Sequence, residues 1–176
     1  MKFTPTRISG AMVIELERRS DERGFFARVW CEDEFRKHGL DPRIAQINTG
    51  FSPRAGTLRG LHFQQVPCAE VKVVRCLRGA VFDVAVDLRK ESPSYRQWFG
   101  MHLTASGGES LYVPEGCGHG YLTLEDNSEV MYLASRPFSA EHASGVRYND
   151  PAFGIQWPME AAVISDADQS WPDFTG

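Results

Sequence analysis

Short segments of strand-like sequence, about ten in number, dominate this chain of 176 residues, and turns containing glycine or proline separate them. In Val81–Leu88 the even-numbered residues are apolar and share one face, while Asp83, Ala85 and Asp87 share the other. This period of two is typical of a half-buried strand, and we interpret both aspartates as structural residues on its polar face. The other expected strands are Val13–Leu16, Ala27–Trp30, Ala45–Phe51, Leu58–Gln64, Val71–Leu77, Gln97–Thr104, Ser110–Val113, Gly120–Leu124 and Val130–Ala134.

Only one segment strongly indicates a helix. Glu32–Gly39 begins with acidic residues, ends with basic ones and stops at a glycine, the charge order that the helix dipole favours. Arg78-Gly79 predicts a hairpin-like turn between the strands that flank it, and residues 150–158 and the tail to Pro172 are typical of coil with one helical turn. Many short strands and little helix indicate an all-β fold. We expect a jelly-roll β-barrel or sandwich with a few short helices, in one domain over residues 1–176.

The composition argues against some classes of function. Apolar residues make up 42% of the chain and charged residues 24%, which is ordinary for a globular protein. The net charge of −4 is spread along the sequence without a basic run, so we expect no nucleic-acid partner. No stretch approaches the roughly 20 apolar residues of a membrane helix, and the N-terminal segment does not resemble a secretory signal. We therefore expect no membrane partner.

The cysteines indicate a reducing compartment. Cys31, Cys68, Cys76 and Cys117 form neither a CxxC pair nor a dense disulfide framework. Reduced thiols are the simplest interpretation and indicate a cytoplasmic protein. Cys117 lies two residues from His119, but sequence neighbours rarely form a Cys/His nucleophile pair, so we do not expect one.

Two glycine-rich segments each contain a histidine: Gly56–Gln64 (GTLRGLHFQ) and Pro114–Gly120 (PEGCGHG). Glycine is favoured where two backbones approach closely or where a turn needs a positive φ. In an extended strand His62 and Gln64 share a face, and Arg59 falls on the opposite face unless the strand bends at its glycine. A histidine in such a place can be a general base, a metal ligand or a hydrogen-bonded core residue.

Two further polar side chains are expected to face the interior of the fold. Lys72 shares a strand face with Val74, and Tyr132 shares one with Val130 and Ala134. Buried polar groups are costly unless they have partners. Each residue alone has a structural interpretation, but together with His62 they favour a ligand site inside the barrel.

A metal centre is one interpretation of the histidines. Pro114-x-Gly116-x-x-His119 resembles the second motif of cupins, in which that histidine binds metal. The first cupin motif contains His-x-His, whereas this chain has His62-x-Gln64. Two histidines without a suitable third ligand fall short of the usual catalytic site. We therefore expect a cupin with no metal and no other cofactor.

Taken together, these motifs resemble the dTDP-4-dehydrorhamnose 3,5-epimerase family, nucleotide-sugar epimerases with a metal-free cupin-type jelly roll. The spacing of LRGLHxQ and PxGxxHG makes the resemblance specific. The matching segments, in chain order, are Asp21–Phe26, Gln46–Asn48, Gly56–Gln64, Lys72–Arg75, Gly79–Arg89, Ser92–Ser94, Tyr112–Leu124, Glu129–Tyr132, Asp150–Pro158, Ser165–Asp168 and Pro172.

The resemblance implies an isomerase and assigns catalytic roles. A 4-keto sugar has acidic C–H bonds at C3 and C5, so epimerisation needs a base, an acid on the other face and a cation for the enolate oxygen. By resemblance His62 is the base and Asp168 orients it. Tyr132 is then the acid, and Lys72 stabilises the enolate.

The resemblance also implies a set of substrate-binding residues. Arg23 and Arg59 match diphosphate contacts, for which a guanidinium suits the phosphate oxygens. Phe138 falls where the family places an aromatic ring against the nucleotide base. The remaining expected substrate contacts are Phe26, Arg28, Gln46, Asn48 and His119.

The match departs from the family at the binding periphery. Arg28 and Ala143 each stand where a glutamate is usual, and Arg147–Asp150 (RYND) replaces a more typical Arg-Trp-Asp-Asp. Charge changes at ligand contacts alter which ligand is preferred. The catalytic set is intact, and by resemblance we expect epimerisation of dTDP-4-dehydro-6-deoxy-D-glucose at C3 and C5. The alternative within this chemistry is a C3-only epimerase or ketoisomerase acting on another nucleotide sugar, with CDP or GDP.

Two alternatives from other classes stay open at this point. A metal-dependent cupin oxygenase would require a transition metal, and a non-catalytic jelly roll would bind a sugar or nucleotide without turnover. The expected partner is a nucleotide-diphosphate sugar. The family also implies a homodimer whose active sites borrow N-terminal residues from the neighbouring chain.

Overall fold

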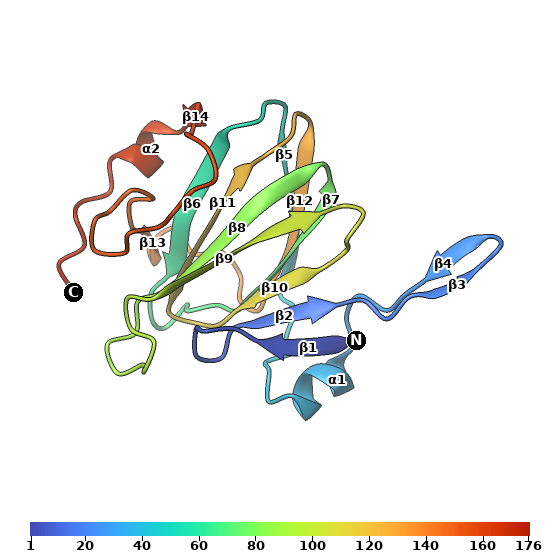
Figure 1. Cartoon of the computed structure of the whole chain (residues 1–176). Coiled ribbons are helices and arrows are strands. Elements are labelled where there is room, and N and C mark those ends of the chain that lie inside the picture. The colour runs from blue at the N-terminus through green and yellow to red at the C-terminus, as the bar shows by residue number, and fades with distance from the viewer.

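The computed structural model describes residues 1–176 and consists mainly of two β-sheets packed face to face (Figure 1). The first sheet has the order β1 (Lys2–Pro5), β2 (Met12–Glu15), β10 (Ser110–Val113), β7 (Lys72–Arg78), β12 (Ser128–Ala134), β5 (Gln46–Ser52). The second has the order β13 (Ala143–Gly145), β6 (Thr57–Gln64), β11 (Cys117–Thr123), β8 (Ala80–Asp87), β9 (Trp98–Thr104), with β14 (Val163–Ile164) parallel to β6. This arrangement confirms the predicted all-β jelly roll.

Three smaller elements complete the fold. The hairpin of β3 (Arg19–Asp21) and β4 (Gly24–Phe26) projects away from the two sheets (Figure 1). Helix α1 (Glu32–Lys37) lies in the predicted helical segment, and helix α2 (Asp166–Gln169) is the helical turn expected in the tail. No helix has the length and apolar character needed to cross a membrane.

Apolar residues of both sheets form the core between them. Val74 and Val130 of the first sheet pack with Val81 and Leu103 of the second, and none of the four is more than 1% exposed. The alternation of the strand residues therefore turns one face of each sheet inward, as predicted.

The C-terminal segment covers the outer face of the second sheet. Val84 and Val86 of β8 pack there against Phe153. The prediction that Val81–Leu88 is half-buried is therefore wrong: the strand is buried on both faces, and Asp83 and Asp87 are 0% exposed. Sequence alternation shows that a strand has two faces, but not what covers each one.

Asp87 has the structural role expected of it. Its carboxylate accepts hydrogen bonds from Arg89, Ser92 and Ser94 in the turn that follows β8. Burial alone would raise the pKa of Asp87, but these hydrogen bonds outweigh it and lower the pKa to about 2.

Two details of the predicted elements are wrong. Ala27–Trp30 is irregular, and no hairpin forms at Arg78-Gly79, because β7 and β8 belong to different sheets. β7 pairs with β10 and β12, whereas β8 pairs with β11 and β9. A turn signal predicts a change of direction but not the partners of the flanking strands. The sequence prediction missed the short strands β1, β3, β4, β13 and β14.

Candidate active site

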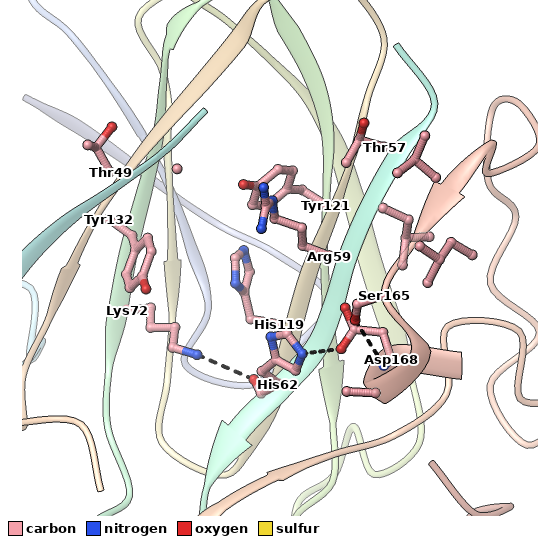
Figure 2. Close-up of a pocket in the computed structure, with 15 residues that line it drawn as sticks. Thr49, Thr57, Arg59, His62, Lys72, His119, Tyr121, Tyr132, Ser165 and Asp168 are labelled. Carbon is pink, nitrogen blue, oxygen red and sulfur yellow. Dashed lines mark hydrogen bonds and ion pairs between the residues drawn. The ribbon is translucent and has the colours of Figure 1, made fainter. Parts of the chain in front are cut away.

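Two chambers open between the sheets, and the same three side chains line both. His62, Lys72 and Tyr132 face a larger chamber of about 670 Å³ and a smaller one of about 290 Å³. His62 comes from β6 of the second sheet, whereas Lys72 and Tyr132 come from β7 and β12 of the first (Figure 2). The predicted catalytic side chains thus converge from the two sheets.

A β-bulge in β6 brings Arg59 to the same side as His62. His62 pairs with His119 and Arg59 pairs with Tyr121, so two residues on β6 lie opposite Gly120 alone on β11. The extra residue reverses the alternation, and both side chains line the larger chamber. The irregularity lies at Gly60 and Leu61, and it places Arg59 on the His62 face against the simple alternation of an extended strand.

Close approach of the backbones explains the glycines at this bulge. Gly60 has a φ of +124°, and a Cβ there would lie 2.5 Å from the Cα of Gly120. Neither position accommodates a side chain without moving the strands apart. The glycines of LRGLHFQ and GHGY therefore keep His62 opposite His119.

A carboxylate orients the imidazole of His62. His62 Nε2 lies 2.5 Å from Asp168 Oδ1, and the backbone N–H of Gly60 donates to Asp168 Oδ2 over 3.2 Å. Burial of Asp168 would raise its pKa, but these hydrogen bonds outweigh burial and hold the pKa below the usual value. An ionised carboxylate only accepts hydrogen bonds, so Nε2 carries the proton and Nδ1 is the basic nitrogen.

The end of the chain holds Asp168 in place. Ser165 caps α2, and its hydroxyl accepts from the Asp168 N–H over 3.1 Å. The parallel pairing of β14 with β6 fixes the same segment against the barrel. Asp168 is only 5% exposed, so it is a wall of the site rather than a solvated tail residue.

Lys72 and Tyr132 form the opposite wall. Lys72 Nζ lies 3.2 Å from Glu70 Oε1 and donates to the backbone carbonyl of His62 over 3.4 Å. Burial raises the pKa of the Tyr132 phenol, and the Glu70 charge adds to the effect while Arg59 opposes it. Tyr132 is therefore a neutral phenol at ordinary pH. Glu70 is not among the predicted site residues, although its position two residues before Lys72 puts both on one side of an extended chain.

A second imidazole–carboxylate pair lies beside the first. His119 Nε2 is 2.8 Å from Asp83 Oδ1, with the two side chains 8% and 0% exposed. The interpretation of Asp83 as a residue of a polar strand face is therefore wrong, because it points inward and supports His119.

Cys117 is not part of this site. It packs among Ile8 and Leu111, and burial raises its pKa to about 12. A thiol with that pKa is no nucleophile near neutral pH.

The donor set does not fit a cupin metal centre. Gln64 stands where the first motif would have its second histidine, but its amide oxygen accepts from Ser139 N and its amide nitrogen donates to Cys68 and Pro137 carbonyls. No group of three or more His, Cys, Asp or Glu side chains is arranged to hold a metal ion. His62 and His119 thus lack the third protein ligand of a catalytic centre.

Of the predicted substrate contacts, Arg59 and His119 line the larger chamber, whereas Gln46, Asn48 and Phe138 line the smaller one. Gln46 and Asn48 of β5 lie there beside Phe138, whose side chain is 67% exposed. Gln46 Oε1 accepts from the Phe138 backbone N–H over 2.5 Å and so fixes the start of that loop. Ala143 and Trp171, the second of which the sequence did not indicate, close the same chamber.

Three predicted substrate contacts lie elsewhere. Arg23 is in the β3–β4 turn, its side chain is 84% exposed, and it pairs with Asp21. Phe26 ends β4 and is 73% exposed, and Arg28 pairs with Glu34 over 3.1 Å. None of the three lines either chamber of its own chain.

Known proteins resemble this chain over nearly its whole length. The sequence model of the dTDP-4-dehydrorhamnose 3,5-epimerase family matches residues 5–176. A protein of that name from Sinorhizobium fredii is 43% identical, over 99% of this chain and 90% of its own length. The crystal structure of the Bacillus anthracis protein of that name, with TDP and PPi bound, has a TM-score of 0.94 at 39% identity and covers 98% of this chain and 99% of that one. The crystal structure of ChmJ, a 3'-monoepimerase from Streptomyces bikiniensis, in complex with dTDP-quinovose has a TM-score of 0.88 at 33% identity. It covers 96% of this chain and 86% of that one.

The match covers the residues of both imidazole–carboxylate pairs, all of which lie within residues 5–176. It also confirms the cupin-type form of the jelly roll. This chain is an isomerase and belongs to the dTDP-4-dehydrorhamnose 3,5-epimerase family.

Proposed function

We propose that this chain epimerises dTDP-4-dehydro-6-deoxy-D-glucose at C3 and C5 to dTDP-4-dehydro-L-rhamnose, in the biosynthesis of deoxysugars for cell-surface polysaccharides. One observation carries the proposal. His62 of the second sheet, paired with Asp168 of α2, faces Tyr132 and Lys72 of the first sheet across shared chambers. A sugar ring between the sheets then has a base on one side and an acid on the other, the arrangement that inversion at carbon needs.

The reaction at each carbon begins with His62. Its Nδ1 removes the proton next to the 4-keto group, and the C–H electron pair moves to form an enolate. Asp168 stabilises the resulting imidazolium, which keeps its second proton on Nε2. The Lys72 ammonium stabilises the enolate oxygen.

Tyr132 completes the inversion. Its hydroxyl gives a proton to the opposite face of the carbon, and the keto group re-forms. The proton on Nδ1 exchanges with solvent, and the phenolate recovers a proton from solvent, so the cycle needs no cofactor. The raised pKa of Tyr132 supports this role, because the phenol is protonated before each turnover.

Residues of both chambers suit the nucleotide diphosphate. Arg59 and His119 line the larger chamber and suit phosphate or sugar oxygens, and Phe138 offers an exposed ring for the base. The relatives that hold TDP and dTDP-quinovose support a nucleotide-diphosphate sugar as the ligand.

A homodimer completes the site in this proposal. Arg23 and Phe26 lie on the β3–β4 hairpin, and Arg28 follows it. None of the three lines a chamber of its own chain, so they reach a substrate only in a neighbouring copy. Exposed apolar side chains on the hairpin, 56% for Phe25 and 73% for Phe26, support a covering partner. Each copy is one domain over residues 1–176, and the four free cysteines support a cytoplasmic location.

Proton NMR in D₂O with chelator-treated protein tests the reaction. With the dTDP-linked 4-keto-6-deoxyglucose we expect deuterium at both C3 and C5. Exchange at C3 alone would replace the proposal with a mono-epimerase, which the 33%-identical ChmJ exemplifies. No exchange with this substrate but exchange with a CDP- or GDP-linked ketosugar would assign a different nucleotide, and no exchange with any of them would reject the proposal.

A further inference from the structure

Glu70 is the one carboxylate of the chambers to which no role has been assigned. It lines the smaller chamber together with Lys72 and Tyr132. Its Oε1 lies 3.2 Å from Lys72 Nζ, and the side chains of the pair are 10% and 12% exposed. A carboxylate this buried is unusual unless it is paired, and the pair lies directly at the reacting space.

The backbone around Glu70 is fixed. Val71, the next residue, donates its N–H to Ser135 Oγ over 2.8 Å and accepts from the Ser135 N–H over 3.0 Å. This double contact ties the loop before β7 to the residue that follows β12. Glu70 thus approaches the chamber from a rigid support, as a residue that positions another group must.

The charges around Tyr132 single out Glu70. Asp168 is hydrogen-bonded to His62 and Asp83 to His119, so the two other carboxylates at the site are each engaged with an imidazole of the second sheet, which faces Tyr132. Arg59 and Tyr121 also face the larger chamber, and β5 contributes no titratable side chain. The Glu70 charge raises the pKa of Tyr132, in addition to burial, while the Arg59 charge lowers it.

We propose that Glu70 is a positioning residue for the reaction: its carboxylate fixes the Lys72 ammonium against the chamber wall and maintains a negative charge near the Tyr132 hydroxyl. This inference rests on the proposed function for its kinetic part only. Held by Glu70 and by the His62 carbonyl, Lys72 has few alternative orientations and meets the enolate oxygen without rearrangement. The negative charge keeps Tyr132 protonated, and therefore ready to act as an acid, at alkaline pH.

The first test needs no substrate. Phenolate absorbance is titrated in the wild type and in Glu70→Gln, each corrected with its Tyr132→Phe counterpart to remove the other tyrosines. Glu70→Gln should lower the Tyr132 midpoint toward the ordinary value of about 10. In Glu70→Asp, which retains the charge, the Tyr132 midpoint should stay near that of the wild type. Glu91→Gln, at an exposed position, should leave the midpoint unchanged.

The second test is kinetic. In Glu70→Gln the alkaline limb of the pH profile for epimer formation should shift to lower pH, by the same amount as the midpoint of the Tyr132 titration. We expect kcat to fall on the order of 10-fold with KM unchanged, less than the 10²–10³ caused by loss of an oxyanion donor. Glu70→Asp should recover most of the rate.

The outcomes are distinct. An unchanged midpoint in Glu70→Gln and in Glu70→Ala would overturn the inference, as would a rise in KM alone. If the wild type does not act on the nucleotide sugar, the proposed function fails, while the phenol titration still decides whether Glu70 acts on Tyr132.

Discussion

His62 and His119 lie directly opposite each other on β6 and β11, and each directs Nε2 at a different buried carboxylate. Asp168 binds the first from the C-terminal helix, and Asp83 binds the second from β8. The Nδ1 atoms are thereby left as the free ring nitrogens. The two rings differ in access, since the side chain of His62 is 46% exposed and that of His119 only 8%. The more open ring is the one proposed to take the substrate proton.

Loss of the base should stop proton exchange. His62→Asn retains an N–H for Asp168 but removes the basic nitrogen, so deuterium incorporation should fall by on the order of 10²–10⁴. His102→Asn, at an exposed position on β9, is the matched control. Undiminished exchange in His62→Asn, measured by NMR in D₂O, would remove His62 from the mechanism.

The bulge at Gly60 should be sensitive to one methyl group. In Gly60→Ala the new Cβ would meet Gly120 Cα at 2.5 Å, so β6 and β11 must separate and Arg59 and His62 lose their common direction. We expect the free energy of unfolding to fall by more than about 2 kcal/mol and the activity to be lost. Gly154→Ala shares a positive φ but has open space around it. Gly154→Ala should lower the free energy of unfolding by about 1–2 kcal/mol and leave activity intact. Equal effects of the two variants on stability and activity would contradict the role given to the bulge.

Asp87 should stabilise the fold without affecting the reaction. Its pKa in the folded protein is about 2, below the usual value of 3.8. A lowered pKa gives stability that is fully present above pH 4 and is lost as the pH falls toward 2. Urea unfolding should show that the free energy of unfolding of Asp87→Asn is about 1–3 kcal/mol below that of the wild type at pH 7. This difference should become smaller as the pH falls toward 2, and kcat should be unchanged. A deficit that does not vary with pH would contradict this account.

Mixed dimers test whether the site is shared between chains. One chain carries His62→Asn and the other Arg23→Ala, and both are made together. If the hairpin crosses to the partner, each mixed dimer has one site with both native residues. Random pairing should then restore about a quarter of the wild-type activity. Activity no higher than that of the two parent variants would mean that Arg23 does not serve the neighbouring site.

Local sequence patterns predicted much of the fold and of the inner site. Alternation around Lys72 and Tyr132 correctly pointed both side chains inward, because each strand has one face on the core. Asp168 was harder to interpret from local sequence, since only a long-range contact with β6 buries it. The motif resemblance supplied that residue.

Other features depend on contacts that no local pattern contains. Asp83 was assigned to a polar face because the C-terminal segment that covers β8 was not foreseen. Glu70 and Trp171 enter the smaller chamber from irregular segments that carry no periodic signal. The remote position of Arg23 follows from the length of the β3–β4 hairpin, which residue types do not determine.

The central claim is that base and acid act from opposite sheets, and Tyr132→Phe tests it most directly. The measurement is proton NMR in D₂O that follows deuterium incorporation and the epimerised product in the same sample. Because His62 is untouched, exchange should continue at a reduced rate, while product formation should fall by at least about 10² for want of a proton donor on the other face. Product formation at the wild-type rate would contradict the account and remove Tyr132 from the mechanism.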